Sequence, residues 1–197
     1  METEKGKLVA QQEGLVKKTR IMVGIDESDE SFHGLQWTLD NLFGCITATA
    51  APEQPEANDK AGSRLITLSL VHVQQAFHLQ YVPAGPGGTV STAFYIPSSV
   101  EESVKKAQQQ IAKALLSRAS DMCKDKMNIE VETLVFEGDP KEKICRAAQE
   151  MHVDLLVVGS RNLGKFKRAF LGSVSDYCAQ HANCPILIVK SPKETSN

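Results

Sequence analysis

Short apolar runs alternate along the chain with longer segments of mixed polarity. Five of these runs are rich in Ile, Val, Leu and Met and have the length of buried strands. They are Arg20–Ile25, Leu65–Val73, Ile129–Phe136, Leu155–Val158 and Ile186–Val189. Their largely continuous apolar character is typical of strands that are covered on both faces of a sheet.

The segments between these runs predict helices. Apolar residues recur at helical spacing from Phe32 to Leu42, from Val100 to Met122 and from Ile144 to Met151. A fourth helix is expected from Ser173 to His181, and Pro185 blocks its extension. Strands that alternate with helices predict a mostly parallel sheet with right-handed crossovers, and therefore an α/β fold.

Residues that favour helix starts follow several of the predicted strands. Asp26–Asp29 suits a turn and an N-cap. In Gly138–Glu142, Asp139 is the expected N-cap, followed by Pro at the first helical position and Glu at the third. Ser173 and Asp176 have the spacing of a capping box. These signals place the helix N-termini directly after the ends of the strands.

The remaining segments are polar or rich in helix and strand breakers. The chain has 197 residues, for which one domain is the default. We expect a single domain over 19–190, with terminal tails at 1–18 and 191–197. Two segments inside the domain, 46–63 and 76–98, are expected to be irregular because they concentrate Pro, Gly, Ala and polar residues.

Composition excludes several classes of partner. With 42% hydrophobic and 23% charged residues and a net charge of -2, the chain has no global attraction for nucleic acid. No window approaches the roughly 18 apolar residues of a membrane span, and the N-terminus lacks the apolar core of a signal peptide. The five cysteines form no C-x-x-C pair, which favours reduced thiols. We expect a soluble protein of the cytosol or nucleus that binds neither membrane nor nucleic acid.

Candidate chemistry concentrates in Asp154–Ser175. An apolar run ends at Gly159, and a loop without acidic residues leads to Gly172 and the start of a helix. Helix N-termini favour anions through their unpaired N–H groups and their dipole. In parallel α/β folds, ligands bind beyond the carboxyl ends of strands, so Asp26, which also follows a strand, is expected in the same pocket. The basic residues of the loop are Arg161, Lys165, Lys167 and Arg168.

Three phosphate-binding patterns compete for this loop. A Rossmann glycine repeat is absent after the first strand. A P-loop is nearly matched by Gly159, Gly164 and Lys165, but Phe166 stands where Ser or Thr would bind magnesium. The third pattern is a glycine, two residues, a glycine, nine residues and then Gly-Ser. It fits from Gly159 to Ser173, except that Asn162 occupies the place of the second glycine.

At this point the chain resembles the universal stress protein family, particularly its plant-type members. The resemblance covers roughly residues 20 to 190 and includes Asp26 after the first strand, the His72-Val73 pair, Gly138-Asp139-Pro140 and the block that ends in Cys184-Pro185-Ile186. It implies a three-layer, open, five-stranded parallel sheet with helices on both faces, similar to Rossmann folds. It also implies the ATP-binding branch of the family, and hence ATP, ADP or AMP as the ligand, with Mg²⁺ accompanying the nucleotide.

The resemblance further implies a set of ligand-binding residues. Gly24 and Asp26 would lie beside the adenosine, Val73 would meet the adenine through its backbone, and the loop from Gly159 would enclose ribose and phosphates. Asn tolerates the left-handed conformation next best after glycine, so Asn162 preserves the loop shape but adds bulk. The full set is Gly24, Asp26, Val73, Gly159, Ser160, Arg161, Asn162, Leu163, Gly164, Lys165, Gly172, Ser173, Val174 and Ser175.

Each of these residues also has a purely structural interpretation. Asp26 suits a helix cap, the basic residues of the loop suit a solvated face, and His72 suits a buried structural role. No set of nucleophile, base and orienting group is visible, so catalytic residues are not assigned.

Three functions are therefore compared: an adenine-nucleotide sensor in stress response, a slow ATPase, and a chaperone-like scaffold with a weakened pocket. The resemblance also implies a homodimer that pairs through Pro185–Val189.

Overall fold

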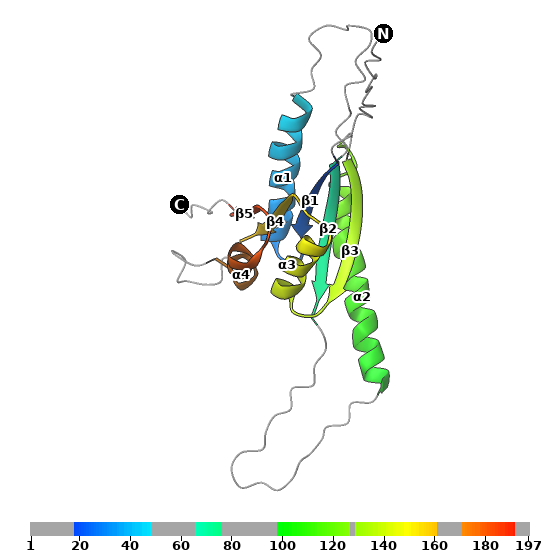
Figure 1. The fold of residues 1–197 in the computed structure, drawn as a ribbon. Coiled ribbons are helices and arrows are strands. Elements are labelled where there is room, and N and C mark those ends of the chain that lie inside the picture. Colours follow the sequence, from blue (N-terminus) through cyan, green and yellow to red (C-terminus); the bar gives the residue numbers. More distant parts are fainter. Residues whose placement is uncertain (1–17, 49–65, 76–97, 127–128, 161–170, 192–197) are drawn as a thin grey trace, which may run out of the picture.

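The computed structural model describes residues 18–48, 66–75, 98–126, 129–160 and 171–191. Within these ranges five strands alternate with four helices (Figure 1). In chain order they are β1 (Thr19–Gly24), α1 (Asp29–Ala48), β2 (Ile66–Gln74), α2 (Ser98–Asp121), β3 (Ile129–Glu137), α3 (Pro140–Glu150), β4 (Leu155–Gly159), α4 (Ser173–His181) and β5 (Ile186–Val189).

The five strands form one parallel sheet in the order β3-β2-β1-β4-β5. The chain begins in the centre of the sheet, builds outward through β2 to β3, and then crosses back to add β4 and β5 on the other side of β1. Strand order therefore reverses at β1, the kind of position where ligands bind in open α/β sheets. The predicted five-stranded parallel α/β sheet is confirmed.

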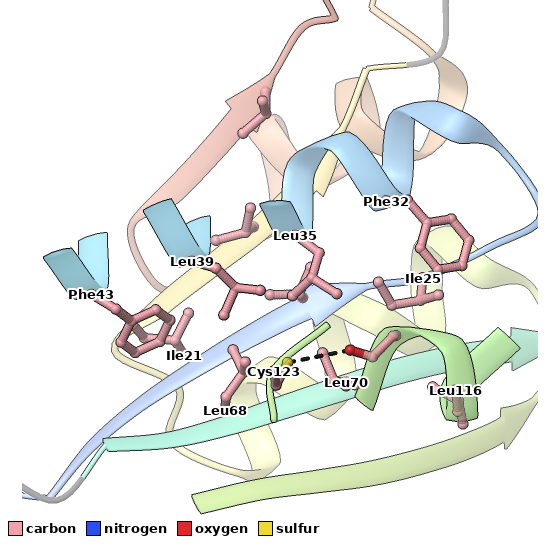
Figure 2. Close-up of a cluster of buried hydrophobic side chains, with 14 of the residues drawn as sticks. Ile21, Ile25, Phe32, Leu35, Leu39, Phe43, Leu68, Leu70, Leu116 and Cys123 are labelled. Carbon is pink, nitrogen blue, oxygen red and sulfur yellow. Dashed lines mark hydrogen bonds between the residues drawn. The ribbon is translucent and has the colours of Figure 1, made fainter. Parts of the chain in front are cut away.

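Two hydrophobic cores lie on opposite faces of the sheet. The first packs α1 and α2 on the sheet and includes the residues labelled in Figure 2: Ile21, Ile25, Phe32, Leu35, Leu39, Phe43, Leu68, Leu70, Leu116 and Cys123. The second packs α3 and α4 on the other face and includes Met22, Val71, Val73, Ile144, Ala147, Ala148, Leu156, Val158 and Cys178. Helices on both faces give the predicted three-layer arrangement.

Strand β2 is buried on both of its faces. Successive side chains point to opposite faces of a sheet, so Leu68 and Leu70 enter the core beneath α1 and α2 while Val71 and Val73 enter the core beneath α3 and α4. All nine residues of the strand are buried. The apolar residues of β2 thus fall on both faces because both faces are buried, as the sequence indicates.

The structure corrects three details of the expected elements. Helix α1 continues to Ala48 and so enters the segment 46–63 that was expected to be irregular. Ser98, expected to close the second irregular segment, is the first residue of α2. The N-cap of α4 is Gly172, and no side chain caps it, so the predicted capping box of Ser173 and Asp176 is wrong. The rest of both segments lies outside the described residues.

Gly159, at the end of β4, is where the first turn of α1 comes closest to the sheet. A Cβ atom on Gly159 would lie 2.4 Å from the carbonyl oxygen of Glu30 and 2.8 Å from the backbone nitrogen of Ser31. Both contacts are with backbone atoms of a helix, which cannot move aside as a flexible side chain can. Glycine at this position is therefore required by helix–sheet packing, whatever else the residue does.

We predict that Gly159→Ala lowers the free energy of unfolding by at least about 2 kcal/mol, because the added methyl group forces α1 away from β4. Urea denaturation measures this loss. Gly24→Ala is the matched control, since a Cβ atom there would have its nearest neighbour, the side chain of Ile144, at an ordinary 3.5 Å. We expect the control to change stability by less than about 1 kcal/mol. Equal effects of the two substitutions would contradict the packing argument.

Candidate functional site

A cleft of about 710 Å³ opens at the carboxyl ends of the central strands. The ends of β1, β2 and β4 form its floor, and the first turns of α1, α3 and α4 form its walls together with two residues of α2. Its lining consists of Gly24, Ile25, Asp26, Glu27, Ser28, Ser31, Val71, His72, Val73, Gln74, Gln75, Gln108, Ile111, Asp139, Pro140, Lys141, Ile144, Val158, Gly159, Gly172, Ser173, Val174 and Ser175. The volume is in the usual range of small-molecule sites, which is about 300 to 1,000 Å³.

Asp26 lies in the turn that joins β1 to α1. Its Oδ1 accepts a hydrogen bond of 2.9 Å from the backbone N–H of Ser28 and a second from the Ser28 hydroxyl. A side chain that bonds the backbone two residues ahead forms an Asx turn, which suits the sequence of this connection. A carboxylate has about four acceptor positions, and the half-buried Asp26 side chain belongs to the lining of the cleft.

Ser31 fixes the same turn from inside α1. Its hydroxyl donates 3.0 Å to the carbonyl of Asp26 and 2.9 Å to that of Ser28, and it accepts from the backbone N–H of Asp26 at 3.2 Å. The residue is only 5% exposed. Ser28 is the N-cap of α1, because its hydroxyl accepts from the backbone N–H of Ser31. The two serines therefore hold Asp26 at the mouth of the cleft.

The end of β2 contributes two buried polar side chains. The Nδ1 of His72 lies 2.9 Å from the carbonyl oxygen of Ile25, so the ring donates to β1 and ties the two strand ends together. This contact supports the structural interpretation of His72. The amide nitrogen of Gln74 is buried without a hydrogen-bond partner in the part of the chain that the structure describes. Val73, between them, is buried against α3.

The N-termini of α3 and α4 both reach the cleft, but they differ in whether a side chain caps them. The N-terminus of α3 is capped, because Asp139 Oδ1 accepts from the backbone N–H of Lys141 at 3.2 Å. This confirms the predicted Asp N-cap followed by Pro at the first helical position. Among the residues that the structure describes, no side chain caps the N-terminus of α4, which begins at Gly172. The positive end of the α4 dipole is therefore available to a group in the cleft.

Lys141 is a cation in the described lining of the cleft. Its Nζ lies 3.5 Å from Asp139 Oδ2 and 5.6 Å from the ring centroid of Tyr177 on α4. Both the ammonium and the carboxylate are substantially exposed, so the ion pair contributes little to stability. The side chain thus extends from the first turn of α3 towards Tyr177 on α4 and is held there by weak interactions.

Known proteins identify the fold that carries this cleft. The family model described as the universal stress protein family matches residues 18–190. The chain belongs to the universal stress protein family.

Two curated members of the family show the level of similarity. A universal stress protein A-like protein of Arabidopsis thaliana is 31% identical over 113 residues, which cover 57% of this chain and 63% of that protein. Universal stress protein YxiE of Bacillus subtilis is 30% identical over 122 residues, 59% of this chain and 82% of that protein. The match to the first relative therefore spans less than two thirds of its length.

Solved universal stress protein structures share the fold. An Arabidopsis thaliana family member with AMP bound has a TM-score of 0.53 at 21% identity, covering 91% of this chain and 96% of that one. A universal stress protein in complex with cAMP has a TM-score of 0.52 at 21% identity, covering 88% of this chain and 98% of that one. At this identity the likeness is one of fold.

Most of the predicted ligand-binding residues that the structure describes lie together in the cleft. Those that line the cleft are Gly24, Asp26, Val73, Gly159, Gly172, Ser173, Val174 and Ser175. Ser160 is fully buried and is absent from the lining, and its backbone N–H donates 2.8 Å to the carbonyl of Val189 on β5. Arg161, Asn162, Leu163, Gly164 and Lys165 lie outside the described residues.

Several lining residues were not predicted from the sequence. Gln74, Gln75, Gln108 and Ile111 reach the cleft because β2 and α2 lie side by side, and the side-chain amide of Gln108 donates 3.0 Å to the backbone carbonyl of Gln75. Lys141 was noted only as part of a helix start. Its position in the sequence, shortly after the end of a predicted strand, could have indicated that it reaches the cleft, because every βα turn of a parallel sheet opens onto the same edge.

The described part of the chain has neither a membrane-spanning helix nor a cluster of metal ligands. No helix within the described ranges has the length and apolar character needed to cross a membrane. Across the same ranges, no three His, Cys, Asp or Glu side chains gather in a way that would hold a metal ion.

We predict that Ser31→Ala lowers the free energy of unfolding by about 1 to 3 kcal/mol, because it leaves buried backbone groups of the β1–α1 turn without their partner. Thermal or urea denaturation measures the change. Ser103→Ala is the control: its hydroxyl donates 2.7 Å to the Ser99 carbonyl but is exposed, so water replaces the bond. A Ser31 variant as stable as the Ser103 variant would show that the turn does not depend on this hydroxyl.

Proposed function

We propose that this universal stress protein binds an adenine nucleotide in the cleft at the carboxyl ends of β1, β2 and β4, and that the bound nucleotide switches its activity in stress response. The observation that carries the proposal is the uncapped N-terminus of α4, which opens onto the same cleft as Asp26 and the end of β2. An anion site and a carboxylate suited to hydroxyl groups thus share one cavity of nucleotide size.

The phosphates are assigned to α4 rather than to α3. Asp139 already occupies the N-terminus of α3 and would repel a phosphate. At α4, backbone N–H groups in the first turn and the hydroxyl of Ser173 can donate to phosphate oxygens. The hydroxyl of Ser175 donates 2.9 Å to the carbonyl of Gly172 and so fixes the turn that presents these groups.

The nucleoside is assigned to the side of the cleft formed by β1 and β2. Asp26 can accept hydrogen bonds from ribose hydroxyls, a role that acidic residues near strand ends have in other dinucleotide-binding α/β folds. Val73, at the end of β2, would meet the base through its backbone. The family members solved with AMP and with cAMP support adenine as the base.

A nucleotide sensor fits this geometry better than a dedicated enzyme. The first turns of three helices and the ends of three strands line the cleft, so a ligand that binds there stabilises the arrangement of all of them relative to the unbound state. Such a change can be read by a partner protein. ATP would bring its own Mg²⁺, and a slow ATPase is tested by phosphate release under single-turnover conditions.

The compartment follows from the cysteine content. Five cysteines without a C-x-x-C pair favour reduced thiols. We propose a protein of the cytosol, with the nucleus as a second compartment.

We predict that AMP, ADP or ATP binds the purified protein in calorimetric titration and that Gly172→Asp abolishes this binding. The new carboxylate caps α4 and repels phosphate, so affinity falls while the free energy of unfolding rises by a few tenths of a kcal/mol. Gly172 has φ -62° and ψ 155°, a conformation open to any residue, so the fold tolerates the change.

Gly172→Asn is the matched control, because it has the same size and capping ability without the charge. We expect it to retain more affinity than the Asp variant. Wild-type affinity in both variants would show that the phosphates lie elsewhere. Absence of AMP, ADP and ATP binding to the wild-type protein at millimolar concentration would contradict the proposed function as a whole.

We also propose that the protein forms a homodimer through β5. This strand is at the edge of the sheet, and Ile186, Leu187 and Ile188 are only partly buried. An apolar edge strand with unpaired backbone groups is a natural site of pairing with another chain.

We predict that Ile188→Pro converts the dimer to a monomer in sedimentation velocity. The carbonyls of Pro185 and Val189 accept hydrogen bonds from β4, so by alternation the backbone of Ile188 faces the free edge. Proline there removes an outward donor and is compatible with an edge strand. Ile188→Val, which keeps the donor, should remain dimeric. A dimeric proline variant would exclude this edge as the interface.

A further inference from the structure

Two cysteine side chains meet in the core between α3 and α4. The thiol of Cys145 on α3 lies 3.5 Å from the sulfur of Cys178 on α4. Each cysteine is the sixth residue of its helix, so both are about one and a half turns from the N-terminus that lines the cleft. The contact therefore joins the two helices at matched depths below the cleft.

The two thiols differ in exposure. Cys178 is fully buried, whereas Cys145 is partly exposed. Burial, followed by the neighbouring thiol of Cys145, raises the pKa of Cys178 well above its ordinary value. Cys178 is thus protected from direct attack, and Cys145 is the sulfur that a small molecule from solvent can reach. A buried neutral thiol is a poor nucleophile. Cys145 is therefore the thiol that meets an oxidant first, and Cys178 reacts only with the oxidised sulfur held in contact with it.

We propose that Cys145 and Cys178 are a redox-active pair that a peroxide converts to a disulfide, which draws α3 towards α4 and narrows the cleft between their first turns. This inference rests on the proposed function for its effect on nucleotide, but the chemistry of the pair stands independently of it.

The reaction balances with hydrogen peroxide as the two-electron oxidant. The sulfur of Cys145 attacks one peroxide oxygen, the O–O bond breaks, and water leaves as Cys145 becomes a sulfenic acid. The sulfur of Cys178 then attacks the sulfenic sulfur, the S–O bond breaks, and the Cys178 proton leaves with the hydroxyl as a second water. Two thiols and one peroxide thus give one disulfide and two waters. A dithiol reverses the step by exchange.

Disulfide formation has a mechanical consequence for the cleft. The sulfur atoms must close from 3.5 Å to about 2.05 Å. Helix α3 contributes three buried residues to this core, Ile144, Ala147 and Ala148, whereas α4 contributes only Cys178. The shorter helix α4 is therefore the element that shifts. Its first turn, with Ser173, then moves towards Lys141 on α3. The space assigned to the phosphates becomes smaller, and nucleotide binds more weakly.

Peroxide treatment of the full-length reduced protein tests the pair. After remaining thiols are blocked with N-ethylmaleimide, we expect an intact mass lower by about 2 Da per disulfide, before the blocking groups are counted, and a peptide that links Cys145 to Cys178. Cys145→Ser should give no such link. Cys184→Ser is the matched control, since Cys184 is also partly buried in the same core, and it should keep the link. The proposal would be overturned if the oxidised wild type gave no linked peptide, or if its only linked peptides joined other pairs of cysteines.

Calorimetry on the same samples tests the regulatory effect. We expect the oxidised protein to bind AMP at least about fivefold more weakly than the reduced protein, with recovery after dithiothreitol. Peroxide-treated Cys145→Ser should bind as the untreated variant does. Equal affinity of oxidised and reduced wild type would refute the regulatory effect. If the reduced protein itself binds no nucleotide, the proposed function fails, whereas the linked peptide still decides the thiol pair.

Discussion

The close contact between the first turn of α1 and the end of β4 is the constraint on which the cleft depends. Only a glycine at position 159 lets the backbone of Glu30 approach the strand end, since a Cβ atom would lie 2.4 Å from its carbonyl oxygen. This contact brings the β1–α1 turn, and with it Asp26, over the carboxyl ends of the central strands. A glycine that the phosphate-loop pattern assigns to ligand binding therefore has a packing role of its own.

The parallel sheet then determines what else reaches this position. Each strand of a parallel sheet ends at the same edge, and each following helix begins there. The reversal of strand order at β1 separates the α1 and α4 turns enough to leave a cavity of about 710 Å³. The cores on the two faces hold the helices in place. The walls of the cavity are therefore the ends of helices that are packed against the sheet.

Helices α3 and α4 differ at the cleft in whether a side chain accepts hydrogen bonds from the N–H groups of their first turn. Asp139 closes the N-terminus of α3, whereas Gly172 leaves that of α4 without a side-chain cap. The two helices also meet below the cleft at Cys145 and Cys178. The proposed anion site and the pair of thiols lie on the same two helices, so the proposed disulfide would act on ligand affinity through the spacing between those helices.

The sequence by itself determined the order and type of the elements, because strand runs such as Leu155–Val158 and the Asp139–Pro140 helix start are local signals. It also indicated that Asp26 and Gly159 face one pocket, because strand ends of a parallel sheet meet at one edge. Only the tertiary structure decided that Gly172 rather than Ser173 begins the cap of α4, that Gly159 is held by the backbone of Glu30, and that Cys145 meets Cys178. These features depend on distances between elements far apart in the chain, and such distances are set by the packing of helices on the sheet, which spacing along a sequence does not encode.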